Sequence, residues 1–492
     1  LGLGLTAEPW QEAAARADAP PDRPARADAV RARLRLLGAL AAVLPLVILW
    51  SSPPPGLAVE GWRALLVLVA GALLLAFDVF PDAIVALLMA AGWVVPGVVE
   101  PRVALAGFAS ESWLLVLSVL AVGVAVGNTG LLYRAALIAL TRAPTAYAWR
   151  VLVLALVGVL VTPTIPNATS RVALAAPVVR EVAEALGYQA GSRAAAGLGM
   201  AALVGFGQMA GLFLTGSSVG LLVHGLLPPE TRAQFGFGAW FLAALPVHLI
   251  LFALALGAIV VWYRPEVSTE DGARRLALQQ AVLGRTSRAE WLSLAVLVGL
   301  VAGFLTEPLH EIDPSWWGVA ALVVLVQGGV LDATTLRTGV NWSFLIFFGA
   351  ITSLGSIFSA LQIDRWLAEL LAAPVGALAA TPTLFCIGLA LAGFGLSLAV
   401  RWQAAAPLLT LVATPAASAA GIHPFLVALI ALVATQAWFL PFQSTLYLAI
   451  YHGSGELFSH AQARRLALVW GPMVLLALVA AVPVWRWMGL LR

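Results

Sequence analysis

Long apolar stretches recur along almost the whole chain, and no other feature restricts its possible folds as much. A transmembrane helix needs about 20 mainly apolar residues. Stretches near that length lie at about 36–52, 62–79, 82–98, 112–133, 195–224, 237–263, 290–306, 316–331, 342–361, 424–450 and 466–488. Hydrophobic residues make up 61% of the chain and charged residues only 10%, whereas soluble proteins carry about 25% charged residues. The sequence therefore predicts an all-α polytopic membrane protein.

The charged residues divide the chain and indicate its orientation. Residues 1–35 are rich in Ala, Pro and Arg, which predicts a disordered cytoplasmic tail. Residues 263–290 carry five arginines and predict a cytoplasmic linker with an amphipathic helix. The linker separates a first half (36–262) from a second half (291–492). Because basic loops face the cytoplasm, we expect a multi-pass protein of a bacterial-type inner membrane with a cytoplasmic N-terminus.

The kinds of charged and sulfur residues exclude several classes of chemistry. All 27 basic residues are Arg, which excludes covalent chemistry on Lys. The single cysteine, Cys386, excludes an intramolecular disulfide and a multi-cysteine metal site. The net charge of +3 gives no indication of nucleic-acid binding. Residues 216–220 match the G-x-S-x-G pattern of hydrolases, but they lie in a predicted span. We therefore predict no catalytic residues and no enzyme.

Two further apolar regions are interrupted near their middle. Pro163, Pro166 and the polar run 167–170 interrupt residues 151–182, and residues 401–403 interrupt residues 383–420. Each arm has about 17 residues and is about 25 Å long as a helix, which is short for a full crossing. The pattern predicts an inner re-entrant hairpin at about 150–187 and an outer one at about 383–420. The alternative is a proline-kinked span.

The two halves resemble each other at a nearly constant offset. Trp113 pairs with Trp342, and Arg134 pairs with Arg365. The interval from Asn167 to Gly187 matches that from Arg401 to Gly421, and "LTGSS" (214–218) pairs with "PFQST" (441–445). An odd number of predicted spans precedes the second half, so the repeats are inverted. Inverted repeats with interrupted helices are typical of secondary transporters.

Several segments resemble the divalent anion/sodium symporter family. They are "PPPGLAVEGWRALLVLVAGALLL" (53–75), "GFASESWLLVLSVLAVGVAVGNTGLLYR" (107–134), "LGRTSRAEW" (283–291) and "VNWSFLIFFGAITSLG" (340–355). The resemblance implies eleven transmembrane helices plus two hairpins, a scaffold domain and a transport domain, and a homodimer. It also implies elevator-type transport of dicarboxylates, tricarboxylates or sulfate.

That family carries a Ser-Asn-Thr motif at each hairpin tip. The first motif falls on Asn167-Ala168-Thr169 within "PNATSR", which resembles "PSNTAR" of the plastid dicarboxylate-translocator branch. The second falls on Arg401-Trp402-Gln403 and has lost all three motif residues. In that family, a break in the helix that follows each hairpin supplies the other half of the binding site. The resemblance implies a substrate-binding set of Asn167, Ala168, Thr169, Thr215, Gly216, Ser217, Arg401, Trp402, Gln403, Gln443, Ser444 and Thr445.

These segments suit an anion better than a sodium ion. The start of a broken helix presents free N–H groups and the positive end of its dipole, which attract a carboxylate or sulfate. Sodium needs several oxygen ligands, and the first tip offers them near Thr162, Thr164, Asn167 and Thr169. The second tip is poorer in oxygens, and Arg401 would repel a cation. We therefore expect reduced or absent sodium coupling, and no other cofactor.

Arg401 is the only Asp, Glu, Lys or Arg between Leu370 and Gly455. A charged side chain at the centre of a bilayer costs about 2.5–3.5 kcal/mol on insertion scales, so its presence needs a reason. Three interpretations stay open: it snorkels to the outer face, it replaces a second sodium, or it binds the substrate anion directly through its planar guanidinium.

The leading hypothesis is secondary transport of a small dianion, by symport or by exchange. One alternative is a membrane protein that binds anions without coupled transport. Another is an arsenite or sodium/proton transporter. Such transporters usually need carboxylates inside the membrane, whereas Asp78, Asp82 and Glu111 lie near the ends of predicted spans.

Overall fold

The computed structural model describes residues 25–265, 277–278, 280–440 and 443–491. Within these ranges the chain is helical and contains no β-strand. The first half comprises α2 (Ala25–Val47), α3 (Val59–Ala76), α4 (Asp82–Val94), α5 (Pro101–Ala104), α6 (Glu111–Gly127), α7 (Leu131–Arg142), α8 (Tyr147–Val161), α9 (Ala168–Ala185), α10 (Arg193–Ala202), α11 (Ser218–Gly225), α12 (Pro229–Gln234) and α13 (Phe237–Trp262). The second half comprises α15 (Arg288–Leu305), α16 (Glu307–His310), α17 (Pro314–Gln327), α18 (Ala333–Gly339), α19 (Trp342–Ala360), α20 (Ile363–Ala379), α21 (Pro382–Ala399), α22 (Trp402–Ala419), α23 (Pro424–Thr435), α24 (Thr445–Gly453) and α25 (His460–Trp487).

The helices confirm the predicted all-α polytopic membrane fold. In the described part of the chain, nine helical segments are long and apolar enough to cross a membrane. The α6–α7 pair also qualifies as one span, bent by 62°. Three shorter apolar helices, α4, α17 and α23, accompany them. The total of eleven crossings and the inverted sense of the repeats stay predictions.

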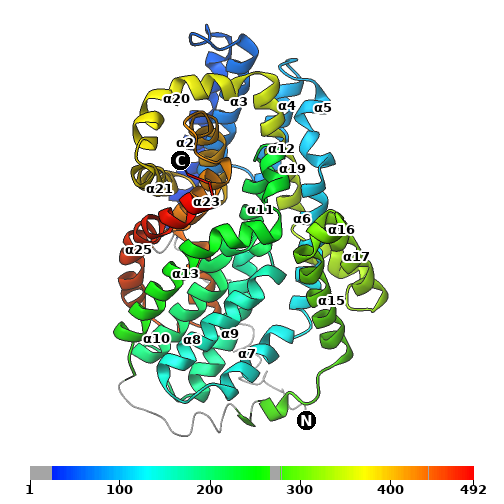
Figure 1. Cartoon of the computed structure of the whole chain (residues 1–492), viewed down its shortest axis with the longest axis vertical. Helices are drawn as coiled ribbons and strands as arrows, with labels where there is room; N and C mark the ends of the chain where they lie inside the picture. The colour runs from blue at the N-terminus through cyan, green and yellow to red at the C-terminus, as the bar shows by residue number, and fades with distance from the viewer. Residues whose placement is uncertain (1–24, 266–276, 279, 441–442, 492) are drawn as a thin grey trace, which may run out of the picture.

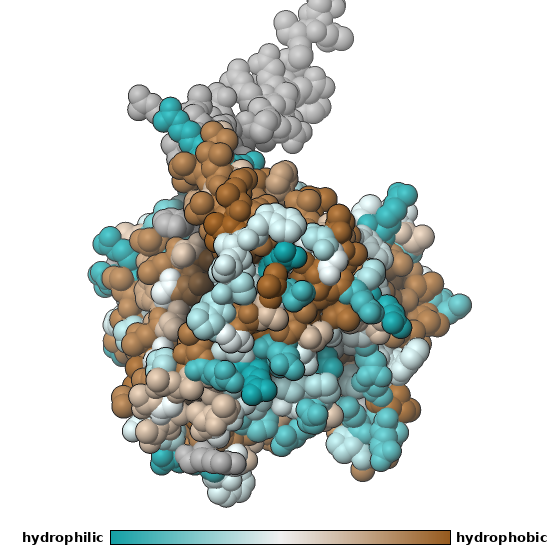
Figure 2. All heavy atoms as spheres, turned by 90° about the horizontal axis from the view of Figure 1, so that it is seen from above, coloured by the Kyte–Doolittle hydropathy of each residue, from teal (hydrophilic) through white to brown (hydrophobic). Residues whose placement is uncertain are grey.

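The two halves of the chain interleave in space. In Figure 1, α19–α22 of the second half lie with α2–α5 in the upper part, while α7–α10 of the first half form the lower part. Helix α25 of the second half packs along α13 of the first. Figure 2 shows one end of the molecule, where hydrophilic side chains gather toward the middle and apolar side chains surround much of them.

Two of the predicted spans are broken rather than continuous. After α10 the chain passes through a π-helical turn, η4 (Leu203–Gly207), and two 3-10 turns, η5 (Gln208–Leu212) and η6 (Leu214–Gly216), before α11 begins. Helix α23 ends nine residues before Ser444, which caps α24. Every residue of the apolar window in 193–212 is buried inside the protein. The irregular backbone of the first break is therefore enclosed by protein, as a bilayer requires.

Close packing of glycines holds the first break against α8. A Cβ atom on Gly205 would lie 2.2 Å from the carbonyl oxygen of Ala155, and one on Gly158 would lie 2.5 Å from the backbone of Gly205. Only residues without a side chain allow the two backbones to approach this closely.

Helix breaks also occur at the two predicted hairpin tips. The 3-10 turn η3 (Thr162–Thr164) and residues 165–167 separate α8 from α9, and residues 400–401 separate α21 from α22. Helix α21 packs against α22, and α8 and α9 both pack against α10. The two regions span 147–185 and 382–419, close to the predicted bounds. Their depth in the bilayer stays a prediction.

The structure differs from the sequence expectation near the N-terminus. Residues 25–35, which we assigned to a disordered tail, form the first turns of α2. Their Ala, Arg and Leu residues have high helix propensity, which outweighs the local polarity. The rest of the predicted tail lies outside the described residues. The amphipathic helix expected in the linker falls largely on residues 266–276 and 279, which also lie outside them.

A buried ion pair joins α7 to the start of α15. The Nε of Arg134 lies 2.7 Å from Oε1 of Glu290, and the two side chains are 12% and 6% exposed. Arg134 also donates to the carbonyl oxygens of Leu283 and Gly284. Glu290 completes a capping box with Ser287 at the start of α15. Arg134 therefore binds the end of the linker to the first half of the chain.

We predict that Arg134→Met lowers the free energy of unfolding by roughly 3 kcal/mol, because it leaves the buried Glu290 carboxylate without its charge partner. Thermal unfolding of the purified protein in detergent measures the loss. Arg365→Met is the matched control, since Arg365 is the counterpart in the second half and, among the described residues, forms its ion pair only with the exposed Glu369. Equal effects of the two substitutions would contradict the prediction.

Candidate functional site

Four helices begin at the two hairpin tips and the two helix breaks. Side chains cap three of them. Asn167 Oδ1 accepts from Ser170 N at 3.0 Å at the start of α9. Ser217 caps α11 and Ser444 caps α24, accepting from Gly220 N at 2.8 Å and Tyr447 N at 3.1 Å. Helix α22 begins after Arg401, whose side chain makes no capping hydrogen bond.

Direct contacts join these four segments. The first tip binds the first break, because Ser218 N donates to Pro166 O at 2.7 Å and Thr215 Oγ1 donates to Pro163 O at 3.0 Å. The first tip also reaches the second break, where the hydroxyls of Thr169 and Thr445 lie 3.3 Å apart. The structure thus brings together residues from both halves, although 276 positions separate these two threonines.

The second tip and the second break share a small cavity of about 10 Å³. It is lined by Trp402, Thr435, Gln436, Ala437, Gln443, Ser444 and Leu446. Gln443 holds the broken segment together, because its Oε1 accepts from Phe439 N and Leu440 N, each at 2.8 Å. Three of the predicted site residues, Trp402, Gln443 and Ser444, therefore meet at one cavity.

The remaining predicted site residues lie close to the same breaks. Ala168, Thr215 and Ser217 are buried, and Gly216 packs against the carbonyl oxygen of Ala210. Gln403 follows Trp402 in the first turn of α22, and its Oε1 is buried without a partner among the described residues. Whether these residues bind a substrate stays a prediction.

A fully buried arginine, Arg171, lies beneath the first tip. Its Nε donates to Phe206 O at 2.6 Å, and its Nη1 donates to Gly216 O at 3.0 Å, to Thr162 O at 3.3 Å and to Ile165 O. These carbonyls come from the first tip and from both sides of the break in the following helix. One guanidinium thus satisfies carbonyls that the broken helices leave unpaired.

Arg171 carries an unbalanced charge. Within the described residues it forms no ion pair, and its Nη2 has no hydrogen-bond partner. Sequence reasoning missed this residue, although it ends the quoted "PNATSR" segment. The sequence did contain one indication of its role, because Arg171 is a charged residue that follows the tip residue Asn167 by four positions and precedes an apolar stretch of the predicted helix. A buried cation without a carboxylate partner attracts an anion, so an anion that binds nearby is stabilised.

The oxygens predicted to bind sodium already have partners. Thr162 Oγ1 donates to Gly158 O at 2.8 Å, and Thr164 Oγ1 donates to Val161 O at 2.7 Å. Asn167 Oδ1 caps α9, and Thr169 contacts Thr445. The carbonyls of Thr162 and Ile165 accept from Arg171. The existence of a sodium site near these four residues stays a prediction.

Arg401 binds a carboxylate that its predicted roles did not include. Its Nη2 lies 2.7 Å from Oδ1 of Asp78 and 3.8 Å from Asp82, and Asp78 also binds Arg35 of α2 at 3.1 Å. Desolvation raises the pKa of Asp78, but hydrogen bonds and charge from Arg35 and Arg401 outweigh it and lower the pKa. The Arg401 side chain is 45% exposed. The outer tip is therefore tied to the turn between α3 and α4.

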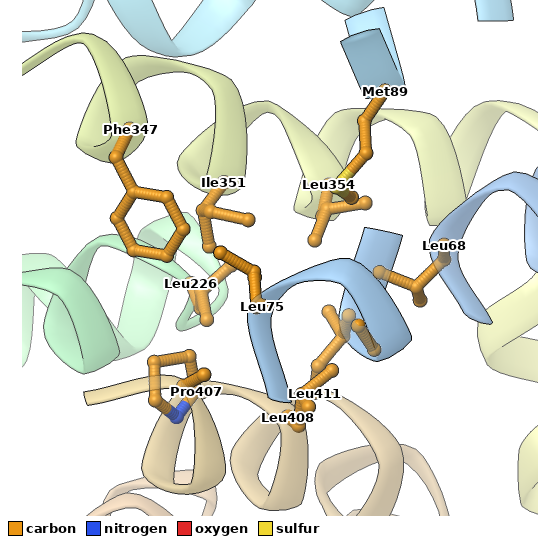
Figure 3. Close-up of a pocket in the computed structure, with 12 residues that line it drawn as sticks. Leu68, Leu75, Met89, Leu226, Phe347, Ile351, Leu354, Pro407, Leu408 and Leu411 are labelled. Carbon is orange, nitrogen blue, oxygen red and sulfur yellow. The ribbon is translucent and has the colours of Figure 1, made fainter. Parts of the chain in front are cut away.

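Apolar packing continues from this ion pair along α22. Pro407, Leu408 and Leu411 of α22 face Leu68 and Leu75 of α3, together with side chains of α4, α11 and α19 (Figure 3). The cavity between them has a volume of only about 20 Å³ and is lined only by apolar side chains. The second arm of the outer hairpin thus contacts α3 and α19 through a surface without directional bonds.

Comparison with known proteins assigns the family. The sequence profile described as "Sodium:sulfate symporter transmembrane region" matches residues 33–491. The chain belongs to the sodium:sulfate symporter family. This confirms the resemblance seen in the sequence, and the family and the relatives are transporters rather than enzymes.

Relatives of this sodium:sulfate symporter family member include bacterial membrane proteins. Inner membrane protein YbhI of Escherichia coli strain K12 is 25% identical over 338 residues, which cover 66% of this chain and 71% of that protein. A membrane protein of Cupriavidus necator is 26% identical, covering 68% and 69%. The L-tartrate/succinate antiporter of Escherichia coli strain K12 is 24% identical over 180 residues, covering 36% of each chain.

Solved structures of transporters share the fold of this family member. The YdaH transporter of Alcanivorax borkumensis superposes with a TM-score of 0.53 at 18% identity, covering 87% of this chain and 98% of that one. MtrF of Neisseria gonorrhoeae superposes with a TM-score of 0.53 at 14% identity, covering 77% and 82%. These likenesses concern the fold alone.

We predict that Arg171→Met prevents folding or lowers the free energy of unfolding by about 3 kcal/mol or more, because it leaves several buried carbonyls without donors. Arg171→Lys should retain only part of the stability, because an ammonium group cannot donate in the planar, forked geometry of a guanidinium. Size-exclusion chromatography and thermal unfolding measure both. Arg180→Met on the same helix is the control, because Arg180 is half exposed and, in the part of the chain that the structure describes, forms an ion pair only with Glu184. A folded Arg171→Met protein of unchanged stability would refute this role.

We also predict that Arg401 and Asp78 are energetically coupled. Arg401→Asp and Asp78→Arg should each lower the melting temperature, because each places like charges together. The double exchange should recover part of the loss, with a coupling of about 0.2–1 kcal/mol for an exposed pair. A double-mutant cycle in detergent and in lipid nanodiscs measures the coupling. Strictly additive losses would show that the pair contributes nothing.

Proposed function

We propose that this chain is a secondary transporter of small dianions, with dicarboxylates as the first candidates. The observation that carries the proposal is the contact of Thr169 with Thr445, which joins the first turns of α9 and α24. The buried cation of Arg171 follows Thr169 by two residues on α9. Helix N-termini, hydroxyls and a cation without a carboxylate partner all favour a negatively charged ligand. The family and the L-tartrate/succinate antiporter among the relatives support the same conclusion.

We propose an elevator-type mechanism of alternating access for the transport cycle. The second arm of the outer hairpin contacts α3 and α19 through apolar side chains. An apolar surface of this kind allows sliding, because no hydrogen bond breaks when the hairpin arm shifts along α3 and α19. A homodimer, as the family resemblance implies, belongs to this proposal.

Sodium coupling is weak or absent in this proposal. The buried guanidinium of Arg171 takes the carbonyl oxygens of the first tip that a sodium ion would need. The second tip offers Trp402 and Gln403 where the family carries hydroxyl and amide ligands. The fixed cation of Arg171 then replaces part of the charge that sodium brings to the site, which favours exchange of anions over sodium symport.

Counterflow in proteoliposomes tests the proposal. Internal unlabelled succinate should accelerate uptake of external labelled succinate, with saturation, because exchange returns the site in its loaded form. Sulfate and L-tartrate on the inner side extend the test to other dianions. Binding without accelerated uptake would favour an uncoupled anion-binding protein. Transport of arsenite or proton-coupled sodium flux, without dianion flux, would favour the remaining alternative.

We predict that succinate uptake depends on sodium with a Hill coefficient not above one, or does not depend on sodium at all. The reason is that Arg171 occupies the carbonyl oxygens of the first tip and the second tip lacks the family's ligands. Uptake is measured at increasing sodium, with choline keeping the ionic strength constant. A Hill coefficient clearly above one would mean that two cooperative sodium sites exist.

A further inference from the structure

An arginine near the start of α3 carries a positive charge without a carboxylate partner. The guanidinium carbon of Arg63 lies 4.6 Å from the centre of the Trp50 ring. Among the described residues Arg63 forms no ion pair, and its Nε is buried without a hydrogen-bond partner. Because the ring covers the flat face of the guanidinium, the N–H donors in its plane stay available to a ligand.

This pair lies where two membrane spans end. The span that contains α2 ends at Trp50, and the next span begins with α3 at Val59. Arg63 follows Val59 by four residues, which is about 6 Å along the helix. Tryptophan side chains are enriched at this level of a membrane, beside the lipid headgroups. Trp62 Nε1 donates to Ser51 Oγ at 3.1 Å and so holds the connecting segment against α3.

The helix face beside the pair is open and apolar. Trp50 is 77% exposed, and Val43 and Val47 of α2 are each at least half exposed. These two valines precede Trp50 by seven and three residues, which places them on the same side of the helix. Only 17% of the span 32–50 is buried inside the protein. A ligand at this position therefore meets a cation at headgroup level and an apolar surface beneath it.

The acidic residue nearest in sequence does not neutralise this charge. Glu60 precedes Arg63 by three residues, but the two side chains form no ion pair in the part of the chain that the structure describes. Glu60 instead lines a cavity together with Arg365 and Glu369. An uncompensated guanidinium favours an anionic ligand, and its forked donors match the paired oxygens of a phosphate.

We propose that Arg63 and Trp50 bind the phosphate of a phospholipid headgroup, while an acyl chain of the same lipid lies along α2. The guanidinium donates to the phosphate oxygens, and the Trp50 ring keeps the guanidinium in place. This site is separate from the hairpin tips and the helix breaks, and it does not depend on the proposed function.

Lipid binding to the delipidated protein in detergent tests the site. Native mass spectrometry measures the dissociation constant of the tightest-bound phosphatidylglycerol. Arg63→Gln should raise that constant about 10-fold, as expected when charge-assisted hydrogen bonds are lost. Trp50→Leu should raise it less, because the charge stays and only the stacking ring is lost. Diacylglycerol with the same acyl chains lacks the phosphate and should bind equally to the unsubstituted protein and to Arg63→Gln.

A matched control separates this site from a general effect of charge. The Arg102 side chain is 92% exposed and pairs with Glu100 at 3.4 Å. Arg102→Gln removes one positive charge elsewhere and should leave the dissociation constant for phosphatidylglycerol unchanged. Melting temperatures without added lipid show which variants are folded. If Arg63→Gln fails to fold, Trp50→Leu and Arg63→Lys decide the matter, and Arg63→Lys should bind more weakly because it loses the fork.

Three results would overturn the proposal. The first is equal binding of phosphatidylglycerol by the unsubstituted protein and by folded Arg63 and Trp50 variants. The second is an equal loss in Arg102→Gln, which would indicate a general effect of charge. The third is stabilisation of the unsubstituted protein, but not of Arg63→Gln, by inorganic phosphate as strongly as by phosphatidylglycerol. That result would indicate a site for a soluble anion rather than for a lipid.

Discussion

The structure depends on how backbone groups are satisfied where helices break in the apolar interior of the protein. A bilayer offers no water to an exposed carbonyl or N–H, so each break needs a partner from within the protein. In the first half that partner is Arg171, whose guanidinium binds Thr162 O, Ile165 O, Phe206 O and Gly216 O. A planar group with several donors suits this task because carbonyls from separate segments converge on it. The same contacts fix the first tip against the break in the following helix.

The second half solves the same problem without a buried cation. At the offset that relates Asn167 to Arg401, the counterpart of Arg171 is Ala405, which is fully buried. The broken segment is instead held by Gln443, whose Oε1 accepts from two backbone N–H groups. The arginine of this half is Arg401, which binds Asp78 on a different part of the protein. The repeats therefore share their helix breaks but differ in where they place positive charge.

Sequence reasoning predicted the architecture because it depends on short-range patterns. Apolar length predicted the spans, and the polar residues around Asn167 and Arg401 predicted both tips within a few residues. It failed where a contact joins distant positions. Asp78 and Arg401 are 323 residues apart, and no local pattern indicates that they meet. The role of Arg171 depends on which face of α9 turns inward, and a largely apolar hairpin gives little periodicity from which to predict it.

The strengths of the two arginine contacts suit the different demands of alternating access. Arg171 is buried and joins the segments of the proposed substrate site, so in the proposed cycle these segments move as one body if they move at all. The contact of Arg401 with Asp78 runs from the outer tip to α3 and α4, and it must break if that hairpin moves past those helices. An ion pair that is about half exposed contributes only about 0.2–1 kcal/mol, so thermal motion can break it in every cycle. The apolar face of α22 beside it has no directional bonds to lose. Strong contacts thus lie within the proposed moving unit, and weak or non-directional contacts lie at its boundary.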